Sequence, residues 1–230
     1  MHKLTVPMTK RELILGWIYF ALQLIVIPSL LLITNELLGY PLSDGGLNVL
    51  MFAINFVCIV GIGWKFLFEN AVKGFSKPGR MFSTVGICLG AYWGMSLIVS
   101  LIIYSIDPEF LNANDAQIGA MLEENPAPLM VGTVILVPIA EEFLYRGLIF
   151  RGLYNHSRIA AYVVSVLFFS ALHVVSYITV YEPIQLLLSL LQYIPPSLCL
   201  AYAYARTDSI WAPILIHTTV NLLASFSMLS

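Results

Sequence analysis

The hydrophobic residues of this chain fall into long stretches separated by short polar segments. A helix needs about 20 mostly apolar residues to cross a membrane, and about seven stretches approach that length. They are residues 13–34, 47–68, 81–106, 129–150, 159–180, 184–205 and 210–228. Because these stretches occupy most of the sequence, the pattern predicts an all-α fold, a polytopic bundle of about seven transmembrane helices.

The polar segments do not suggest a separate soluble domain. The widest is DPEFLNANDAQIGAMLEENPAP, from Asp107 to Pro128, and its centre is compatible with a short helix on the membrane surface. No internal repeat or long linker divides the chain. We therefore expect one integral membrane domain, in which residues 1–128 hold the first three spans and this loop, and residues 129–230 form a four-helix core.

Prolines interrupt two of the predicted spans. Pro138 lies in the fourth span, about one turn before two glutamates, and Pro195 and Pro196 lie near the middle of the sixth. A proline inside a helix frees a backbone carbonyl and bends the helix, which is tolerated where protein or water surrounds it. We expect a kink at the first site and a break at the second, explained either by packing or by a lateral opening of the bundle.

The composition agrees with a membrane protein. Of 230 residues, 59% are hydrophobic and only 10% are charged, and the mean hydropathy is +0.87, far above that of soluble domains. The net charge of −2, without a basic cluster, argues against nucleic-acid binding. Cys58, Cys88 and Cys199 lie in separate apolar stretches without metal-ligand spacing, so we interpret them as packing residues.

Basic residues predict the orientation, because loops rich in Lys and Arg stay in the cytoplasm. With a cytoplasmic N-terminus, all 11 Lys and Arg residues fall on the cytoplasmic side, and the outer loops contain acidic residues alone. The basic residues are Lys3, Lys10, Arg11, Lys65, Lys73, Lys77, Arg80, Arg146, Arg151, Arg158 and Arg206. The pattern places the C-terminus outside, and the short loops favour a bacterial plasma membrane.

A few polar residues lie inside the predicted spans. Ionisable groups there cost at least a few kcal/mol each, so each one needs either a partner or a function. They are Glu141, Glu142 and Arg146 in the fourth span, His173 in the fifth and His217 in the seventh, where Asn221 accompanies it. Counted from the cytoplasmic ends of the spans, Glu141, His173, His217 and Asn221 lie roughly 10 to 20 Å deep and can share one layer of the membrane.

Residues four apart lie on one face of a helix, which predicts an ion pair between Glu142 and Arg146. Such a pair can be purely structural, as can a single histidine that binds a neighbouring carbonyl. Glu141 points about 100° away from Glu142 and has no basic residue at helical spacing. A structural explanation is weakest for Glu141.

Three segments together resemble a known family. EEFLYR (Glu141–Arg146), FSALH (Phe169–His173) and HTTVN (His217–Asn221) match, in order and type, the motifs EExxxR, FxxxH and HxxxN of the CPBP family. That family comprises CAAX prenyl endopeptidases and bacteriocin-processing or self-immunity proteases, all intramembrane enzymes of the Abi group. The resemblance covers about residues 129–225.

The resemblance implies an intramembrane glutamate protease that cleaves a membrane-associated peptide or protein. Glu141 would be the general base that activates a water molecule, and His173 would hold or activate that water. His217 and Asn221 would donate hydrogen bonds to the oxyanion of the tetrahedral intermediate. The resemblance does not select among prenylated peptides, leader peptides and membrane-anchored regulators as substrates.

The remaining motif residues, Glu142, Arg146 and Phe169, are expected to support this site. Every motif position is filled, so an active enzyme is expected. Aspartic and serine chemistry fit less well, because no Asp lies within a span and no nucleophile motif accompanies the histidines.

A zinc-dependent version of the same hydrolysis is the alternative. Glu141, His173 and His217 form a ligand set found in some catalytic zinc sites. However, no HExxH motif is present, and if Glu141 bound the ion the base would be Glu142, which is expected to pair with Arg146. We therefore expect catalysis without a cofactor.

Two other classes of function stay open. A proton-coupled transporter also places Glu and His in mid-membrane, although no paired halves are visible in the sequence. A non-catalytic immunity protein would use the polar cluster to hold its helices together. In every case the lipid bilayer is an expected partner and nucleic acid is not.

Overall fold

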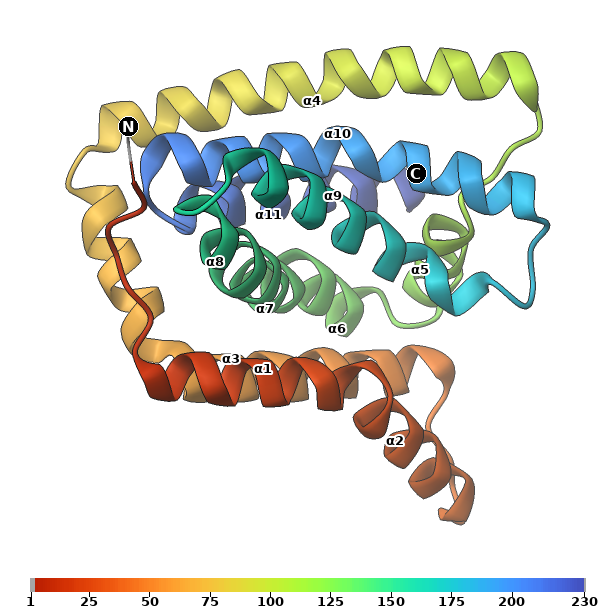
Figure 1. The fold of residues 1–230 in the computed structure, drawn as a ribbon. Coiled ribbons are helices and arrows are strands. Elements are labelled where there is room, and N and C mark those ends of the chain that lie inside the picture. The colour runs from red at the N-terminus through yellow and green to blue at the C-terminus, as the bar shows by residue number, and fades with distance from the viewer. Residues whose placement is uncertain (1–2, 230) are drawn as a thin grey trace.

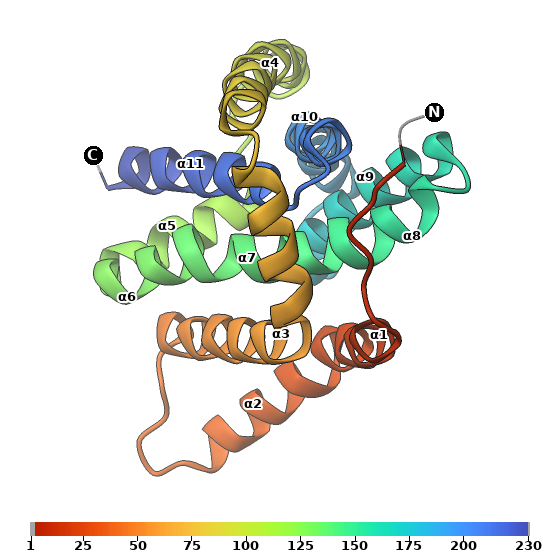
Figure 2. The ribbon, with the colours of Figure 1, turned by 90° about the vertical axis from the view of Figure 1, so that its left-hand side faces the viewer.

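The structure, a computed structural model, describes residues 3–229, and this part of the chain is all-α. The elements are α1 (Lys10–Leu24), α2 (Val26–Leu37), α3 (Asp44–Phe75), α4 (Pro78–Ile106), α5 (Ala113–Glu124), α6 (Pro126–Val131), η1 (Gly132–Leu136), α7 (Val137–Glu142), η2 (Phe143–Phe150), α8 (Arg151–Tyr154), α9 (Arg158–Val174), η3 (Val175–Tyr177), α10 (Pro183–Thr207) and α11 (Trp211–Met228). The axes of α1, α4 and α10 are roughly parallel, as seen side-on in Figure 1 and end-on in Figure 2, with α10 running opposite to the other two, and α11 crosses them.

Five helical segments are long and apolar enough to cross a membrane, and the bent pair α1–α2 raises the number to six. The chain is therefore a multi-pass membrane protein. The predicted seventh stretch forms α11, but α11 is not among these segments. Polar residues in its middle, including His217 and Asn221, interrupt its apolar surface. The count of seven spans is therefore not confirmed for the residues that the structure describes.

A composite helical rod carries the fourth predicted span through the middle of the bundle. It runs from α6 through η1, α7 and η2 to α8, and both η1 and η2 are π-helical. The rod packs against α3, α9 and α11, and α7 lies between α3 and α11 in Figure 2. All 8 residues of η2 are buried. Residues 142–146 of the motif-bearing segment are thus buried within the protein.

Gly63 allows α3 to approach this rod. The backbone of α3 leaves helical geometry at Gly63, with φ −112° and ψ 18°. A Cβ atom at this position would lie 2.0 Å from Cε2 of Phe143, so a larger residue would force the two helices apart. Because Phe143 follows the two glutamates directly, this close approach helps to fix the end of α7 that bears them.

The double proline does not break its helix. The helix α10 is continuous from Pro183 to Thr207 and contains both Pro195 and Pro196. The predicted break is therefore wrong. The fixed φ of proline is compatible with helical geometry, so the helix continues, although each proline lacks a backbone N–H donor. The helices α4 and α9 pack along α10 and hold it in shape.

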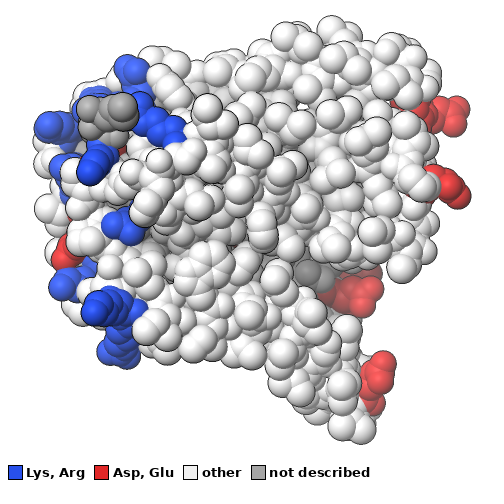
Figure 3. All heavy atoms as spheres, in the orientation of Figure 1, with Lys and Arg blue, Asp and Glu red and all other residues white. Residues whose placement is uncertain are grey.

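Charged side chains divide between the two ends of the molecule. Lys and Arg gather at the end that holds the start of α1, the α3–α4 turn and α8, whereas acidic residues predominate at the end that holds α5 (Figures 1 and 3). Arg146 departs from the expectation that every basic residue lies at the cytoplasmic face, because η2 buries it completely. Which end faces the cytoplasm stays a prediction.

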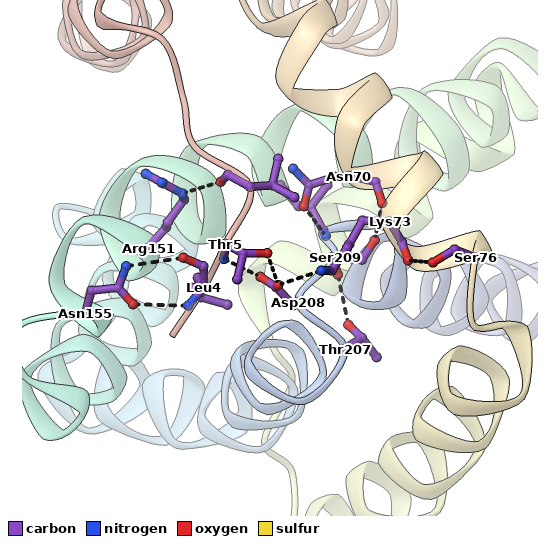
Figure 4. A network of polar contacts seen from close by, with 12 residues as sticks. Leu4, Thr5, Asn70, Lys73, Ser76, Arg151, Asn155, Thr207, Asp208 and Ser209 are labelled. Atoms are coloured by element: carbon purple, nitrogen blue, oxygen red, sulfur yellow. Dashed lines mark hydrogen bonds and ion pairs between the residues drawn. The ribbon is translucent and has the colours of Figure 1, made fainter. Parts of the chain in front are cut away.

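At the basic end, the segment before α1 is tied across the turn between α10 and α11 (Figure 4). The backbone N–H and the Oγ of Thr5 donate to the two carboxylate oxygens of Asp208, and Nζ of Lys73 lies 3.6 Å from the same carboxylate. Asp208 is 3% exposed and adopts a left-handed conformation with φ 55°. Side chains of Arg151 and Asn155 bind the backbone of the N-terminal segment. These contacts close the end of the bundle opposite α5.

Candidate active site

Three helices bring the four predicted catalytic residues to one cavity of about 410 Å³. Glu141 projects from α7, His173 from α9, and His217 and Asn221 from α11. Residues of α4, α5 and α10 also line it. A cavity of this size, largely apolar but with a few convergent polar groups, is typical of a ligand-binding site.

Glu142 is the centre of a buried hydrogen-bond network beside the cavity. Its Oε1 accepts hydrogen bonds from Nη1 of Arg146 at 3.1 Å and from Nδ1 of His217 at 2.9 Å. Nη2 of Arg146 also donates to the carbonyl and the Oγ of Ser197 on α10. Helical spacing predicted the first of these contacts, whereas the bonds to His217 and Ser197 were not foreseen. The network links α7, η2, α10 and α11.

The bond to Glu142 sets the tautomer of His217. A carboxylate accepts hydrogen bonds, so Nδ1 of His217 carries a proton. In the neutral ring Nε2 then has a lone pair and acts as an acceptor, and it donates only when the ring is protonated. An imidazolium in this position is directly paired with the carboxylate of Glu142. The assignment of His217 as an oxyanion donor therefore requires its charged form.

Phe169 contacts both His173 and Arg146. Its carbonyl accepts a hydrogen bond from Nδ1 of His173 at 2.7 Å, and its ring lies 4.4 Å from the imidazole. The ring of Tyr193 covers the imidazole at 4.5 Å. The guanidinium of Arg146 lies 4.7 Å from the Phe169 ring, within cation–π range. Because Nδ1 is the donor to a carbonyl, Nε2 of neutral His173 is an acceptor.

Glu141 faces His173. Its Oε2 lies 3.9 Å from Nε2 of His173, which is longer than a direct hydrogen bond. The two side chains are 24% and 16% exposed. Within residues 3–229, Oε2 of Glu141 is shielded but has no hydrogen-bond partner, and no Lys or Arg nitrogen lies within ion-pair distance of Glu141. The two adjacent glutamates thus have different surroundings.

Asn221 is oriented by a backbone carbonyl that Pro138 leaves free. Nδ2 of Asn221 donates to the carbonyl of Thr133 at 2.8 Å. In the π-helical register of η1, the N–H of Val137 binds the carbonyl of Gly132, so the next residue would bind that of Thr133. That residue is Pro138, which has no N–H. One N–H of the Asn221 amide takes the place of that donor, and the second is left for another acceptor.

Comparison with protein families adds an independent observation. Residues 123–223 match the family described as type II CAAX prenyl endopeptidase Rce1-like. This segment is an Rce1-like domain. It contains all three motifs and agrees with the family and the range that the sequence motifs indicated. No curated protein and no solved structure shows significant similarity to the chain.

The family is one of peptidases, so residues 123–223 form a peptidase-family domain within a multi-pass membrane protein. A protein substrate follows from the family, and a bilayer follows from the candidate spans. The match covers the rod from α6 to α8, the helices α9 and α10, and most of α11. It also begins within α5, which forms part of the cavity wall.

The Rce1-like domain does not assemble the predicted zinc ligands. Among the residues that the structure describes, no group of three His, Cys, Asp or Glu side chains is placed to hold one metal ion. Glu141 and His173 face one another, whereas Nδ1 of His217 is bonded to Glu142. The set of Glu141, His173 and His217 therefore does not fit a single ion in this arrangement.

Several cavity residues were not predicted from the sequence. Asn112 caps α5 through Oδ1, and its Nδ2 donates to Oε1 of Gln192 at 2.6 Å. The hydroxyl of Tyr193 donates to Oδ1 of Asn112 at 3.3 Å. Asn114 and Asp115, at the start of α5, also line the cavity. The only sequence signal was the concentration of polar residues in the loop before the fourth span.

Asp115 brings a second carboxyl group to the cavity wall. The residue is exposed at the acidic end of the molecule, but neighbouring protein atoms displace part of the solvent around its carboxyl group. This desolvation raises the pKa of the Asp115 carboxyl, and a hydrogen bond from Asn114 and the charge of His173 oppose the rise. No Lys or Arg of the described chain pairs with Asp115.

Proposed function

We propose that this protein hydrolyses a peptide bond in a membrane-associated peptide or protein, and that the reaction takes place in the cavity between α7, α9 and α11. The observation that carries the proposal is the meeting of Glu141, His173, His217 and Asn221 at one cavity. Each motif alone has a structural explanation. Their convergence from three helices supplies the base and the hydrogen-bond donors that peptide hydrolysis needs.

The first step is activation of water between Glu141 and His173. The carboxylate of Glu141 and Nε2 of neutral His173 are both acceptors, so a water molecule that donates one hydrogen to each has its lone pairs directed elsewhere. Glu141 takes a proton as the water oxygen attacks the carbonyl carbon of the substrate. His173 holds the second hydrogen and fixes the direction of attack.

The second requirement is stabilisation of the oxyanion. The free N–H of Asn221 is one donor, positioned by the bond to Thr133. The other is Nε2 of His217 in its protonated form, which is paired with Glu142. When the tetrahedral intermediate collapses, the C–N bond breaks and Glu141 returns its proton to the leaving nitrogen.

Glu142, Arg146 and Phe169 act through the groups that they position. Glu142 holds Nδ1 of His217, and Arg146 neutralises Glu142 while resting on the Phe169 ring. Phe169 in turn orients His173. The supporting motif residues thus connect the two halves of the proposed catalytic apparatus. No step of this mechanism needs a metal ion.

The test is a comparison of membrane peptides in cells that carry the wild-type protein or Glu141→Gln. We expect an uncleaved precursor to accumulate with the variant while the protein itself persists in the membrane. Loss of the variant protein from the membrane would instead indicate that Glu141 holds the bundle together. Unchanged peptides together with lost proton-coupled flux would favour a transporter.

A further inference from the structure

We propose that Glu12, at the start of α1, is a positioning residue for the candidate active site. Its carboxylate holds the break in α3 at Gly63, and the segment that bears Glu141 and Glu142 rests against that break. Glu12 lies outside residues 123–223, so the Rce1-like match does not include it. Its effect on catalysis rests on the proposed peptidase function, whereas its effect on the structure does not.

Glu12 is a buried carboxylate that the proposed mechanism does not use. It is 4% exposed, and within residues 3–229 no Lys or Arg forms an ion pair with it. A buried charge needs partners, and here two backbone N–H groups provide them. Oε2 accepts from the N–H of Thr9 at 2.7 Å, and Oε1 accepts from the N–H of Phe66 at 2.9 Å. One side chain therefore connects α1 with α3, which lie against each other (Figures 1 and 2).

Both bonds cap the start of a helical segment. The bond from Thr9 belongs to the capping box of α1. The N–H of Phe66 is the third after the break at Gly63, so it is among the donors that lack an acceptor where a helical segment begins. The side chain of an N-cap residue normally accepts from the second or third N–H that follows it, and a negative charge is favoured at this end of a helix. Glu12 therefore caps the second part of α3 from a neighbouring helix.

The helix α3 cannot supply this acceptor itself. Gly63 occupies the position of the N-cap, but a Cβ atom there would overlap the ring of Phe143. The residues that usually cap helices, such as Ser, Asp and Asn, therefore do not fit between α3 and the rod. The close approach of these two helices and the acceptor from α1 are thus two parts of one arrangement.

Phe66 connects this arrangement to the EEFLYR segment. Its ring lies 5.9 Å from the ring of Phe143 in an edge-to-face contact, and both side chains are buried. A Cβ atom at Gly147 would lie 3.2 Å from Cε1 of Phe66. Phe143 follows Glu142, and Gly147 follows Arg146. Phe66 therefore lies close to the segment at two places, directly after the carboxylates and directly after their arginine.

Loss of the carboxylate would leave the N–H of Phe66 buried without this acceptor, which is costly. A change in the break of α3 relieves that cost but moves Phe66 relative to Phe143. Glu141 is two residues before Phe143, and its approach to His173 forms the proposed water site. In enzymes a misplacement of about 1 Å can lower the rate by about 10²-fold. We therefore expect loss of Glu12 to lower kcat rather than to weaken substrate binding.

The experiment uses the purified full-length protein in detergent micelles and compares two variants, each with a matched control. Glu12→Gln keeps the size of the side chain but removes its charge and one of its two acceptors. Its control is Thr9→Ala, which removes the hydroxyl of the α1 capping box but not the bond between Glu12 and Phe66. Gly63→Ala disturbs the same contact from α3 while Glu12 stays in place. Its control is Gly61→Ala, because a Cβ atom at Gly61 meets nothing within 4 Å.

Hydrolysis of a fluorogenic apolar peptide, measured below the unfolding temperature of each protein, gives kcat and KM. Glu12→Gln and Gly63→Ala should lower kcat about tenfold and change KM by less than about twofold. Thr9→Ala should lower the unfolding temperature but keep the wild-type kcat, and Gly61→Ala should keep both. A wild-type kcat in Glu12→Gln or in Gly63→Ala would overturn the inference, as would an equal fall in kcat for a variant and its control.

Hydrogen exchange, followed by mass spectrometry, separates this inference from the proposed function because it needs no substrate. Glu12→Gln should speed exchange at residues 63–68 and 141–147, whereas Thr9→Ala should speed it only at the start of α1. Faster exchange at both segments without hydrolysis by the wild type would support the positioning role and count against the peptidase function. Hydrolysis by the wild type, with unchanged exchange at residues 141–147 in Glu12→Gln, would retain the peptidase function and reject the positioning role.

Discussion

Nδ1 of His217 lies 2.9 Å from Oε1 of Glu142, although 75 residues separate the two in the chain. Arg146 binds the same oxygen, so Oε1 of Glu142 links α7 to η2 and α11. Glu141, the preceding residue, instead faces His173 in the cavity. Two adjacent carboxylates therefore have different tasks, and their substitutions should have different consequences.

Replacing Glu141 with Gln should lower kcat by about 10²- to 10⁴-fold, because the proposed base is lost while the side-chain shape is kept. Thermal unfolding in detergent should change little, since the nearest contact of Glu141 is the 3.9 Å approach to His173. Peptide hydrolysis by the purified protein measures the change in kcat, and its thermal unfolding measures the change in stability. Full activity of this variant would remove Glu141 from the role of base.

Replacing Glu142 with Gln should destabilise the protein by about 3–5 kcal/mol, because Arg146 is left buried without a counter-charge. The exposed pair Lys65–Glu69 offers a control with the same spacing, with side chains 53% and 40% exposed. Glu69→Gln should cost at most about 1 kcal/mol. Denaturant unfolding in micelles compares the two, and similar losses would contradict the assigned role of Glu142.

Replacing Pro138 with Ala should lower kcat by about ten- to a hundredfold without unfolding the protein. The new backbone N–H competes for the carbonyl of Thr133 and releases the amide of Asn221, one of the proposed oxyanion donors. Pro195→Ala is the matched control, because Pro195 is buried in α10 and does not line the cavity. We expect kcat to fall for Pro138→Ala and to stay unchanged for Pro195→Ala. An equal fall in kcat for the two variants would contradict this explanation.

Exhaustive chelation should leave the activity of the purified protein unchanged, because the proposed steps use the side chains alone. Residual metal is measured by elemental analysis and activity by peptide hydrolysis. Loss of activity on chelation with recovery on adding zinc would overturn the proposal. A geometry different from the one described would then have to bring His217 to the ion.

Replacing Asp208 with Ala should lower the free energy of unfolding by about 1–3 kcal/mol, because Thr5 loses its two acceptors and Lys73 its counter-charge. The left-handed backbone at this position adds to the cost for alanine. Glu109→Ala, an exposed acid at the opposite end, is the control and should change the stability by less than about 0.5 kcal/mol. An equal effect of the two would show that the N-terminal segment adds nothing.

Local relationships could be predicted from the sequence by itself. The apolar stretches gave the positions of the helices, and the spacing of four residues gave the pair of Glu142 with Arg146. Such contacts depend on the helical repeat alone, which is the same in every fold. The motifs gave the family for the same reason, since each is contained within about one helical turn.

Only the tertiary structure decided what each of these groups meets on other helices. Examples are the bond of His217 to Glu142, the burial of Arg146 against Ser197, and the presence of Asp115 in the cavity wall. These contacts depend on how each helix is rotated and how closely it approaches its neighbours. The π-helical turns shift the faces of the central rod, and packing at Gly63 brings α3 against it. Both effects arise from packing between distant segments, which residue spacing along one helix does not encode.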